Sequence, residues 1–498
     1  MGIVRKQSTY STIFTYLGFA VGALNIIILF PTFFSKEEFG LTRLIGDFAM
    51  FFSALATMGT LNGLYKFNPF YKDYLPAGKN DLPFLTVVLN VIGAVLFVIA
   101  ALVFEPYLER QFGNNSPLFV ANYRLVIPYT VSYTCLMVLE AFCWTIKKTI
   151  ISTLVKELFY RFTTTVLIFL YVLHWITLDT FFLLFSLSYI PALLILIFVI
   201  YQNGGITLYY KISSTTRRLY KKILVFISYH YSGLLISILP RAVDGILIAR
   251  LTDNGLQNLA VYSIPVYLVT IMEVPQRSMQ GIATTLIAEA WKNKDRGKIE
   301  ELYKKSSINL LVLGLGILGL MLPNMDNLIR FNPDYQMAKA IFIVAAIAKI
   351  IDLGMGMNAQ ILSLSKFWRT DFYSSAIFIF VNIALDYFMI KRYGVIGAAY
   401  GSGIALIFYN LLRYTYLWFL FKMQPFTLKT LYVLLIAGMD ILIVWQIPLL
   451  DNLYIDTIMR CFVFVLLYLP AILYFQISTD ITEMFWNFAN KVGLKKKY

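Results

Sequence analysis

The feature that most constrains this chain is a series of apolar segments that recurs from one end of the sequence to the other. About fourteen can be recognised, each close to the roughly 20 residues that an α-helix needs to cross a bilayer. They lie at residues 11–33, 44–66, 83–104, 118–146, 150–173, 181–201, 223–249, 259–289, 306–322, 336–361, 371–390, 396–420, 428–447 and 455–476. Of the 498 residues, 59% are hydrophobic and only 14% are charged, which is too much apolar surface for a water-soluble protein. The sequence therefore predicts an all-α integral membrane protein.

The charges between these segments predict the orientation of the chain. Lys and Arg gather in alternate connections, at 66–79, 147–148, 211–222, 292–305, 365–369 and 491–498. The opposite connections carry few, and only the pair Lys391–Arg392 runs against the trend. Positive charge stays on the cytoplasmic side of a membrane, so both termini are predicted to be cytoplasmic. This topology accounts for the formal net charge of +15, and no nucleic-acid partner is predicted.

The segments also indicate an internal repeat. Segments 11–33 and 223–249 both end in a short polar hairpin that contains Gly and leads into a long second helix. We therefore predict two six-helix lobes in the same orientation, at 1–206 and 207–425, the second beginning with a basic cytoplasmic loop. Residues 426–498 supply two further helices and an amphipathic cytoplasmic tail. Parallel repeats are one plan of membrane transporters, with the substrate site between the halves.

Three predicted helices carry polar or charged side chains at membrane depth. An arginine at the centre of a bilayer costs about 2.5–3.5 kcal/mol on insertion scales, so such residues face a water-filled cavity or another helix. At helical spacing, one-sided stripes include Asn25 in the first helix, Ser237, Arg241 and Asp244 in 223–249, and Glu273, Arg277 and Gln280 in 259–289. The bland alternative stays open: Arg241 with Asp244, and Glu273 with Arg277, have the spacing of ion pairs along one helix.

Further acids lie deep in other segments. Glu140 lies in 118–146, and Lys349 and Asp352 are three residues apart in 336–361, where a structural pair is one reading. Asp244, Glu273, Asp352 and Glu140 are the candidate residues for binding a coupling ion, H⁺ or Na⁺. No motif of hydrolase or nucleotide-binding chemistry is present, and the two histidines and three cysteines show no metal spacing. Neither a cofactor nor a metal is predicted.

The stretch `VNIALDYFMIKRYGVIGAAYGSGIALIFYNLL`, residues 381–412, resembles the hairpin of helices 11 and 12 in the MOP superfamily of exporters. The matching residues are Asn382, Tyr393, Gly394, Gly397, Ala398 and Ala399. The chain departs from that pattern in lacking a proline at 390–392 and in placing Asp386 where a neutral polar residue is more usual. Residues 29–48 resemble the first hairpin of the superfamily. `VKELFYRF` at 155–162, with Glu157 and Arg161, and `QILSLSKFWR` at 360–369 resemble its polysaccharide flippase branch.

This resemblance implies two six-helix bundles in a V, with two extra C-terminal helices. It implies a Wzx-type flippase, a transporter and not an enzyme, of the bacterial inner membrane. The expected substrate is an undecaprenyl-pyrophosphate-linked oligosaccharide, moved by alternating access through a central cationic cavity by a protein that acts as a monomer. The predicted substrate-binding residues are Arg277, Arg241, Arg161, Gln280, Asn25 and Ser237. Arginine suits a pyrophosphate because its planar fork binds two oxygens at once.

Three alternatives remain. A lipid II flippase, which moves the peptidoglycan precursor, fits the same residues. A multidrug cation antiporter would need acids without partners, whereas Arg241 and Arg277 favour an anion. A membrane-embedded polysaccharide polymerase or ligase would need a large outer loop, and the connections here are short.

Overall fold

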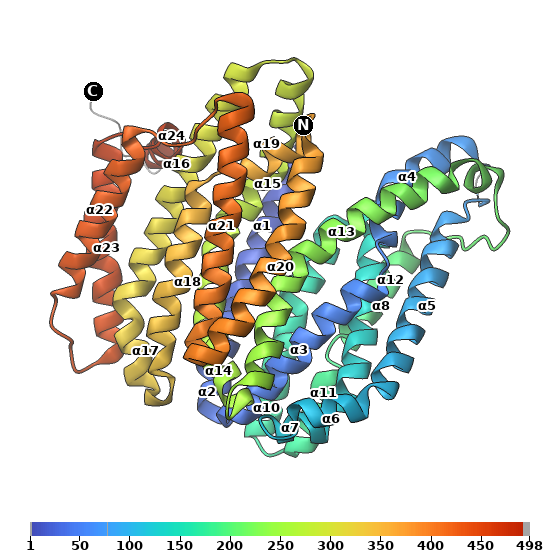
Figure 1. The fold of residues 1–498 in the computed structure, drawn as a ribbon, viewed down its shortest axis with the longest axis horizontal. Helices are drawn as coiled ribbons and strands as arrows, with labels where there is room; N and C mark the ends of the chain where they lie inside the picture. The colour runs from blue at the N-terminus through green and yellow to red at the C-terminus, as the bar shows by residue number, and fades with distance from the viewer. Residues whose placement is uncertain (1, 77, 492–498) are drawn as a thin grey trace. The chain divides into compact units, whose positions relative to one another are not determined.

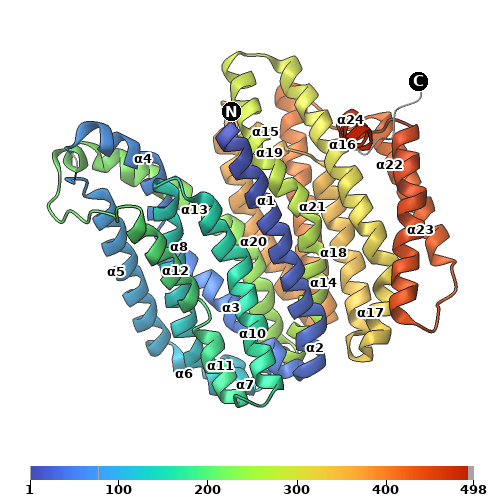
Figure 2. The same cartoon turned by 180° about the vertical axis from the view of Figure 1, so that it is seen from behind.

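The protein is described from a computed structural model that covers residues 2–76 and 78–491. Within that range, the side chains of residues 2–12, 229–230, 232–234, 236–237, 488–489 and 491 are not described. The described residues form helices joined by short links, with no strand among them, and the predicted all-α class is confirmed (Figures 1 and 2). Contacts divide the chain into two compact units. Unit 1 comprises Met1–Ser263 and Ile390–Val395, and unit 2 comprises Ile264–Met389 and Ile396–Tyr498.

The helices of unit 1 are α1 (Gly2–Ala23), α2 (Phe30–Phe33), α3 (Lys36–Ala56), α4 (Thr60–Tyr74), α5 (Leu82–Val103), α6 (Glu105–Phe112), α7 (Pro117–Asn122), α8 (Val126–Thr145), α9 (Thr149–Leu154), α10 (Tyr160–Val172), α11 (Leu178–Ser186), α12 (Ile190–Gln202) and α13 (Ser214–Leu251). Two π-helical turns, η1 (Leu24–Leu29) and η3 (Val155–Phe159), interrupt the first and fifth predicted segments, and η2 (Tyr123–Leu125) is a 3₁₀ turn. Helix α14 (Gly255–Met272) begins in unit 1 and ends in unit 2.

The helices of unit 2 are α15 (Val274–Lys292), α16 (Arg296–Met321), α17 (Met325–Phe331), α18 (Met337–Gly354), α19 (Asn358–Leu364), α20 (Trp368–Tyr393), α21 (Val395–Phe421), α22 (Leu428–Trp445), α23 (Leu453–Tyr474) and α24 (Thr479–Lys491), with 3₁₀ turns η4 (Leu322–Asn324) and η5 (Pro333–Tyr335). The last of these helices, α24, covers most of the tail predicted to be amphipathic.

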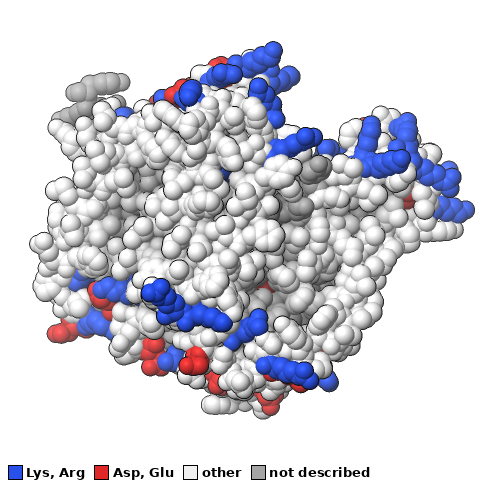
Figure 3. Space-filling view, in the orientation of Figure 1, with Lys and Arg blue, Asp and Glu red and all other residues white. Residues whose placement is uncertain are grey.

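Eleven helices in the described part of the chain are long and apolar enough to cross a membrane, or up to twelve if the bent pair α18–α19 is one span. Two other predicted segments are also helical. Residues 149–172 run through α9, η3 and α10 but carry Lys156, Glu157 and Arg161, and residues 223–249 lie within α13. A multi-pass membrane protein is thus the architecture, while the count of fourteen spans stays a prediction. On the face drawn in Figure 3, charged side chains gather over helix ends and leave broad uncharged surface between them.

Within unit 1, α13 packs along α4 and α3 (Figure 1). Tyr71 near the end of α4 hydrogen-bonds Thr216 at the start of α13 at 2.7 Å, and Gly63 near the start of α4 lies against Ile227 further along α13, so α4 and α13 run antiparallel. Burial raises the pKa of Tyr71 and keeps this hydroxyl protonated. Asp81 accepts the Ser213 N–H at 2.8 Å and holds the start of α13 against the α4–α5 link.

The two hairpins that suggested a repeat pack directly against each other. The Cβ that a side chain at Gly40 of α3 would add falls 1.9 Å from the Leu256 carbonyl oxygen of α14, so only glycine permits this approach. Ser116 and Asn115 donate to the carbonyls of Ala249 and Arg250 at 2.7 Å each. These contacts place α13 and the start of α14 in unit 1. The lobe boundaries at 206 and 425 stay a prediction about which helices move together.

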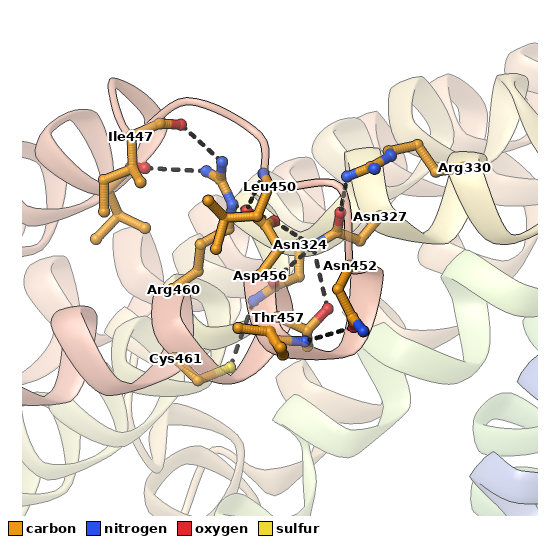
Figure 4. Close-up of polar contacts among 12 residues, drawn as sticks. Asn324, Asn327, Arg330, Ile447, Leu450, Asn452, Asp456, Thr457, Arg460 and Cys461 are labelled. Atoms are coloured by element: carbon orange, nitrogen blue, oxygen red, sulfur yellow. Dashed lines mark hydrogen bonds and ion pairs between the residues drawn. The ribbon is translucent and has the colours of Figure 1, made fainter.

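Within unit 2, a cluster of buried polar side chains holds the two extra C-terminal helices, α22 and α23, in place (Figure 4). Arg460 Nε and Asp456 Oδ2 of α23 are 2.6 Å apart, with 2% and 0% of their side chains exposed. Asp456 also accepts from Asn327 of α17 at 2.6 Å, and Arg460 donates to the carbonyls of Val444 and Ile447. Each of the three guanidinium nitrogens therefore donates one hydrogen bond within the protein, and the pair serves to hold α17, α22 and α23 together. Neither Arg460 nor Asp456 was among the residues predicted from the sequence.

Candidate functional site

A chain of charged and amide side chains runs through the interior of unit 2. Arg277 Nη2 lies 2.9 Å from Glu273 Oε2, and Lys349 Nζ lies 2.8 Å from the other oxygen, Glu273 Oε1. Lys349 Nζ is also 2.9 Å from Asp352 Oδ2. Asp352 Oδ1 accepts from Asn410 of α21 at 2.9 Å, and Asn410 in turn accepts from Asn358 at 2.9 Å. We call these six residues the Lys349 network.

Local sequence places the four charged members of the network in two pairs. Glu273 occupies the N-cap position of α15 at its junction with α14, and Arg277 follows one turn later, in ion-pair spacing. Lys349 and Asp352 share a face of α18 because they are three residues apart. The tertiary packing then brings α18 to the α14–α15 junction, so that one ammonium group contacts acids from two helices.

The burial of the Lys349 network is uneven. The Lys349 side chain is 9% exposed, whereas the Arg277 side chain is 45% exposed. Its two bases and two acids balance in formal charge, which is how charges are tolerated at membrane depth. The arrangement therefore presents one accessible guanidinium, backed by an acid that a second, buried cation also holds.

The structure brings three predicted site residues together in this network: Arg277, Glu273 and Asp352. It adds Lys349 as their bridge, a residue that the sequence placed only in a local pair with Asp352. Gln280, one turn beyond Arg277, is exposed. No periodicity rule could have linked Lys349 to Glu273, because the two lie 76 residues apart in the sequence.

A second polar cluster lies in unit 1, where α1 packs on α9 and η3. Asn25, in the π-helical turn η1, donates to the Arg161 carbonyl at 2.9 Å and accepts from Thr165 at 2.7 Å. The Arg161 guanidinium lies 3.0 Å from Glu157 Oε2 and 4.9 Å from the centre of the Phe19 ring. The predicted residues Asn25 and Arg161 thus lie in one site, flanked by two π-helical turns, a feature frequent at functional sites.

Glu140 of α8 pairs with Lys156 of η3 at 2.8 Å. Beside them lies a group of tyrosines: Tyr160 stacks on Tyr189 with ring centres 4.2 Å apart, and Tyr160 hydrogen-bonds Tyr129. Lys156 was not predicted as a site residue, although it lies in the `VKELFYRF` stretch that resembles the polysaccharide flippase branch and could have been found from it.

The predicted stripe of α13 is only partly described. Asp244 is buried and accepts a hydrogen bond from Tyr262 of α14 at 2.8 Å. Arg241 is exposed. Ser237 belongs to the part of α13 whose side chains lie outside the described residues. Whether Arg241 and Arg277 act together stays a prediction.

The hairpin that carried the resemblance has a polar centre. Asp386 of α20 is fully buried and accepts hydrogen bonds from Asn382 on the same helix and from Ser402 of α21. The unusual acid at this position therefore has hydrogen-bond donors inside the protein.

Among the described residues, no group of three or more His, Cys, Asp or Glu side chains is arranged to hold a metal ion.

Comparison with solved structures identifies the fold. The chain is similar to "Lipid II flippase MurJ, inward closed conformation", with a TM-score of 0.73 and 16% identity over 93% of this chain and 98% of that one. It is also similar to an inward-facing multidrug resistance MATE family transporter of the MOP superfamily, with a TM-score of 0.61 and 15% identity over 81% and 93% of the two chains. A MOP superfamily transporter from Pyrococcus furiosus gives 0.54 and 14% over 82% and 94%.

Neither protein-family models nor curated protein sequences give a match to this chain. The structural likeness therefore shows the fold alone, which is similar to that of these transporters and flippases. The substrate has to be argued from the site.

Proposed function

We propose that this protein flips an undecaprenyl-pyrophosphate-linked oligosaccharide across the bacterial inner membrane by alternating access, and that Arg277 binds the pyrophosphate. The observation that carries the proposal is the half-exposed Arg277 guanidinium on a helix of the membrane domain, in contact with an acid that Lys349 also binds. A phosphate group can bind such a guanidinium through two of its oxygens at once. An organic cation, by contrast, would meet acids that already have basic partners.

A second candidate is a flippase of lipid II. The lipid II flippase MurJ matches this chain over 93% of its length, whereas the multidrug transporters match 81–83%. Both candidate substrates carry a polyprenyl pyrophosphate, so Arg277 serves either one. The resemblance of residues 155–162 to the polysaccharide branch, together with the Arg161–Glu157 pair that the structure forms there, leads us to prefer the oligosaccharide.

The test is a reconstitution of the purified protein in vesicles that contain either undecaprenyl-pyrophosphate oligosaccharide or lipid II. The fraction of headgroup reached by an added enzyme or lectin reports flipping. We expect the oligosaccharide to be moved and recovered chemically unchanged. Faster movement of lipid II would select the second candidate, and a chemically altered lipid would indicate a polymerase or ligase. Arg296→Ala, at an exposed arginine of α16, serves as the control variant.

The direction of flipping depends on topology. We propose that both termini and the basic connections face the cytoplasm, which puts Lys221 at the start of α13 on the inside and Asp326 of α17 on the outside. Cysteines introduced at these two positions should react with an impermeant thiol reagent from opposite sides of the membrane. Reaction from the same side would overturn this topology.

A further inference from the structure

The carboxylate of Glu273 has an unusual position, because a different cation binds each of its two oxygens. Oε2 lies 2.9 Å from the Arg277 guanidinium and Oε1 lies 2.8 Å from the Lys349 ammonium. Arg277 and Lys349 therefore enclose a site for an anion, and in this structure a side chain of the protein itself fills it. A carboxylate and one edge of a phosphate group both present a pair of oxygens to such donors.

The remaining contacts of the network explain why the carboxylate can leave. Lys349 keeps a second counter-ion, Asp352, at 2.9 Å, and the other oxygen of Asp352 is held by Asn410. Loss of Glu273 from the site therefore leaves no buried lysine uncompensated, which is the costly event in a membrane protein. The exposed side of Arg277 provides the access route, while the Lys349 end is closed.

The Glu273 side chain is not needed to cap a helix. The residue lies at the break between α14 and α15, and Pro275, in the first turn of α15, has no N–H to donate. Glu273 occupies the N-cap position of α15 but its side chain makes no capping hydrogen bond, so its displacement by a ligand breaks no cap of that helix.

We propose that Arg277 and Lys349 form an anion-binding site for a phosphate group and that Glu273 is its internal occupant, which the ligand displaces and which helps to release the ligand when it returns. The identity of the ligand as a lipid-linked pyrophosphate rests on the proposed function. The competition between Glu273 and a phosphate anion does not. Such a competitor limits the affinity of the site for the phosphate ligand, and a transporter needs limited affinity in order to release its substrate.

The experiment measures the dissociation constants of inorganic pyrophosphate and of undecaprenyl pyrophosphate for the purified full-length protein. Glu273→Gln removes the competing charge and is expected to tighten the binding of both probes by about tenfold. Lys349→Met is expected to weaken binding by about tenfold, and Lys349→Arg to retain it. Glu300→Gln, which removes an acid from an exposed ion pair with Lys304, should change neither constant.

A matched variant separates competition from a simple change of local charge. Asp352→Asn removes the other acid of the network but leaves Glu273 in place. Among the described residues, Lys349 then has only Glu273 as a carboxylate partner and holds it more firmly, so pyrophosphate affinity should be unchanged or weaker. Equal tightening by Asp352→Asn and Glu273→Gln would show a general electrostatic effect and overturn the proposal. Should Glu273→Gln fail to fold, Glu273→Asp, whose shorter carboxylate cannot span both cations, takes its place with a smaller tightening expected.

Failure of this inference and failure of the proposed function are distinguishable. A wild-type protein that flips the lipid-linked oligosaccharide, but whose Glu273→Gln variant binds pyrophosphate no more tightly, retains the function and loses the internal competitor. Tighter binding of inorganic pyrophosphate by Glu273→Gln, without flipping of any lipid by the wild type, keeps the anion site and removes the function.

Discussion

The ion pairs around Lys156 in unit 1 and around Lys349 in unit 2 are organised differently. In unit 1, Glu140 pairs with Lys156 and Glu157 pairs with Arg161, so that each of these two acids has one base as its ion-pair partner among the described residues. In unit 2, the charges form a chain in which Glu273 and Lys349 each have two partners of opposite sign. In a closed pair, by which we mean one acid bound to one base, loss of either partner leaves the other charge uncompensated. A shared charge can change partners while staying compensated, and for that reason we place the exchange of a ligand in unit 2.

The largest effect is expected from Arg277, whose removal should abolish flipping without loss of the fold. Arg277→Ala should lower the flipping rate by at least about thirtyfold, because it deletes the accessible half of the anion site, and Arg277→Lys should retain part of the rate. Flipping in vesicles and protein yield would be measured together. Recovery of both yield and transport in Arg277→Ala/Glu273→Ala would mean that the arginine only holds α15 in shape.

Lys156 of unit 1 should be needed for stability. Lys156→Met leaves Glu140 without an ion-pair or hydrogen-bond partner among the described residues, which we expect to cost about 3 kcal/mol of unfolding free energy. Thermal unfolding in detergent measures it. Replacing the whole pair, in Lys156→Met/Glu140→Leu, should restore most of the loss. A Lys156→Met protein as stable as the wild type would contradict the proposed difference between the closed pairs of unit 1 and the shared charges of unit 2.

Lys349 of unit 2 should behave in the opposite way. In Lys349→Met, Glu273 keeps Arg277 and Asp352 keeps Asn410, so the expected loss of unfolding free energy is only about 1 kcal/mol. The main effect of Lys349→Met should therefore be weaker ligand binding and not a lower stability. Destabilisation as large as that of Lys156→Met, measured in the same detergent, would show that the network is held together as rigidly as the closed pairs.

The smallest effects are expected from the amide substitutions at the candidate ion-coupling residues Asp244, Glu273, Asp352 and Glu140. If shared charges exchange partners, Glu273→Gln and Asp352→Asn should reduce the stimulation of flipping by an imposed H⁺ or Na⁺ gradient by about twofold to tenfold. Glu140→Gln and Asp244→Asn should change it less. Flipping is measured with and without the gradient, and unchanged stimulation in all four variants would exclude these acids from coupling.

Part of the site could be predicted from the sequence because it depends on local spacing. Glu273 and Arg277 are one helical turn apart, as are Glu157 and Arg161, and both pairs form. The contact of Lys349 with Glu273 and that of Lys156 with Glu140 join different helices, and helical periodicity carries no information about which helices become neighbours. The same holds for Asn327, which reaches Asp456 from another part of unit 2.

The sequence by itself determined that this chain is helical and lies in a membrane, because apolar segments of spanning length can satisfy their backbone in lipid only as helices. It also determined which charges had to find partners, since a charge at that depth is costly anywhere in the fold. Only the tertiary structure decided which residues are the partners of those charges. The packing of α18 at the α14–α15 junction placed one lysine between two acids, and that arrangement makes Arg277 available to a ligand.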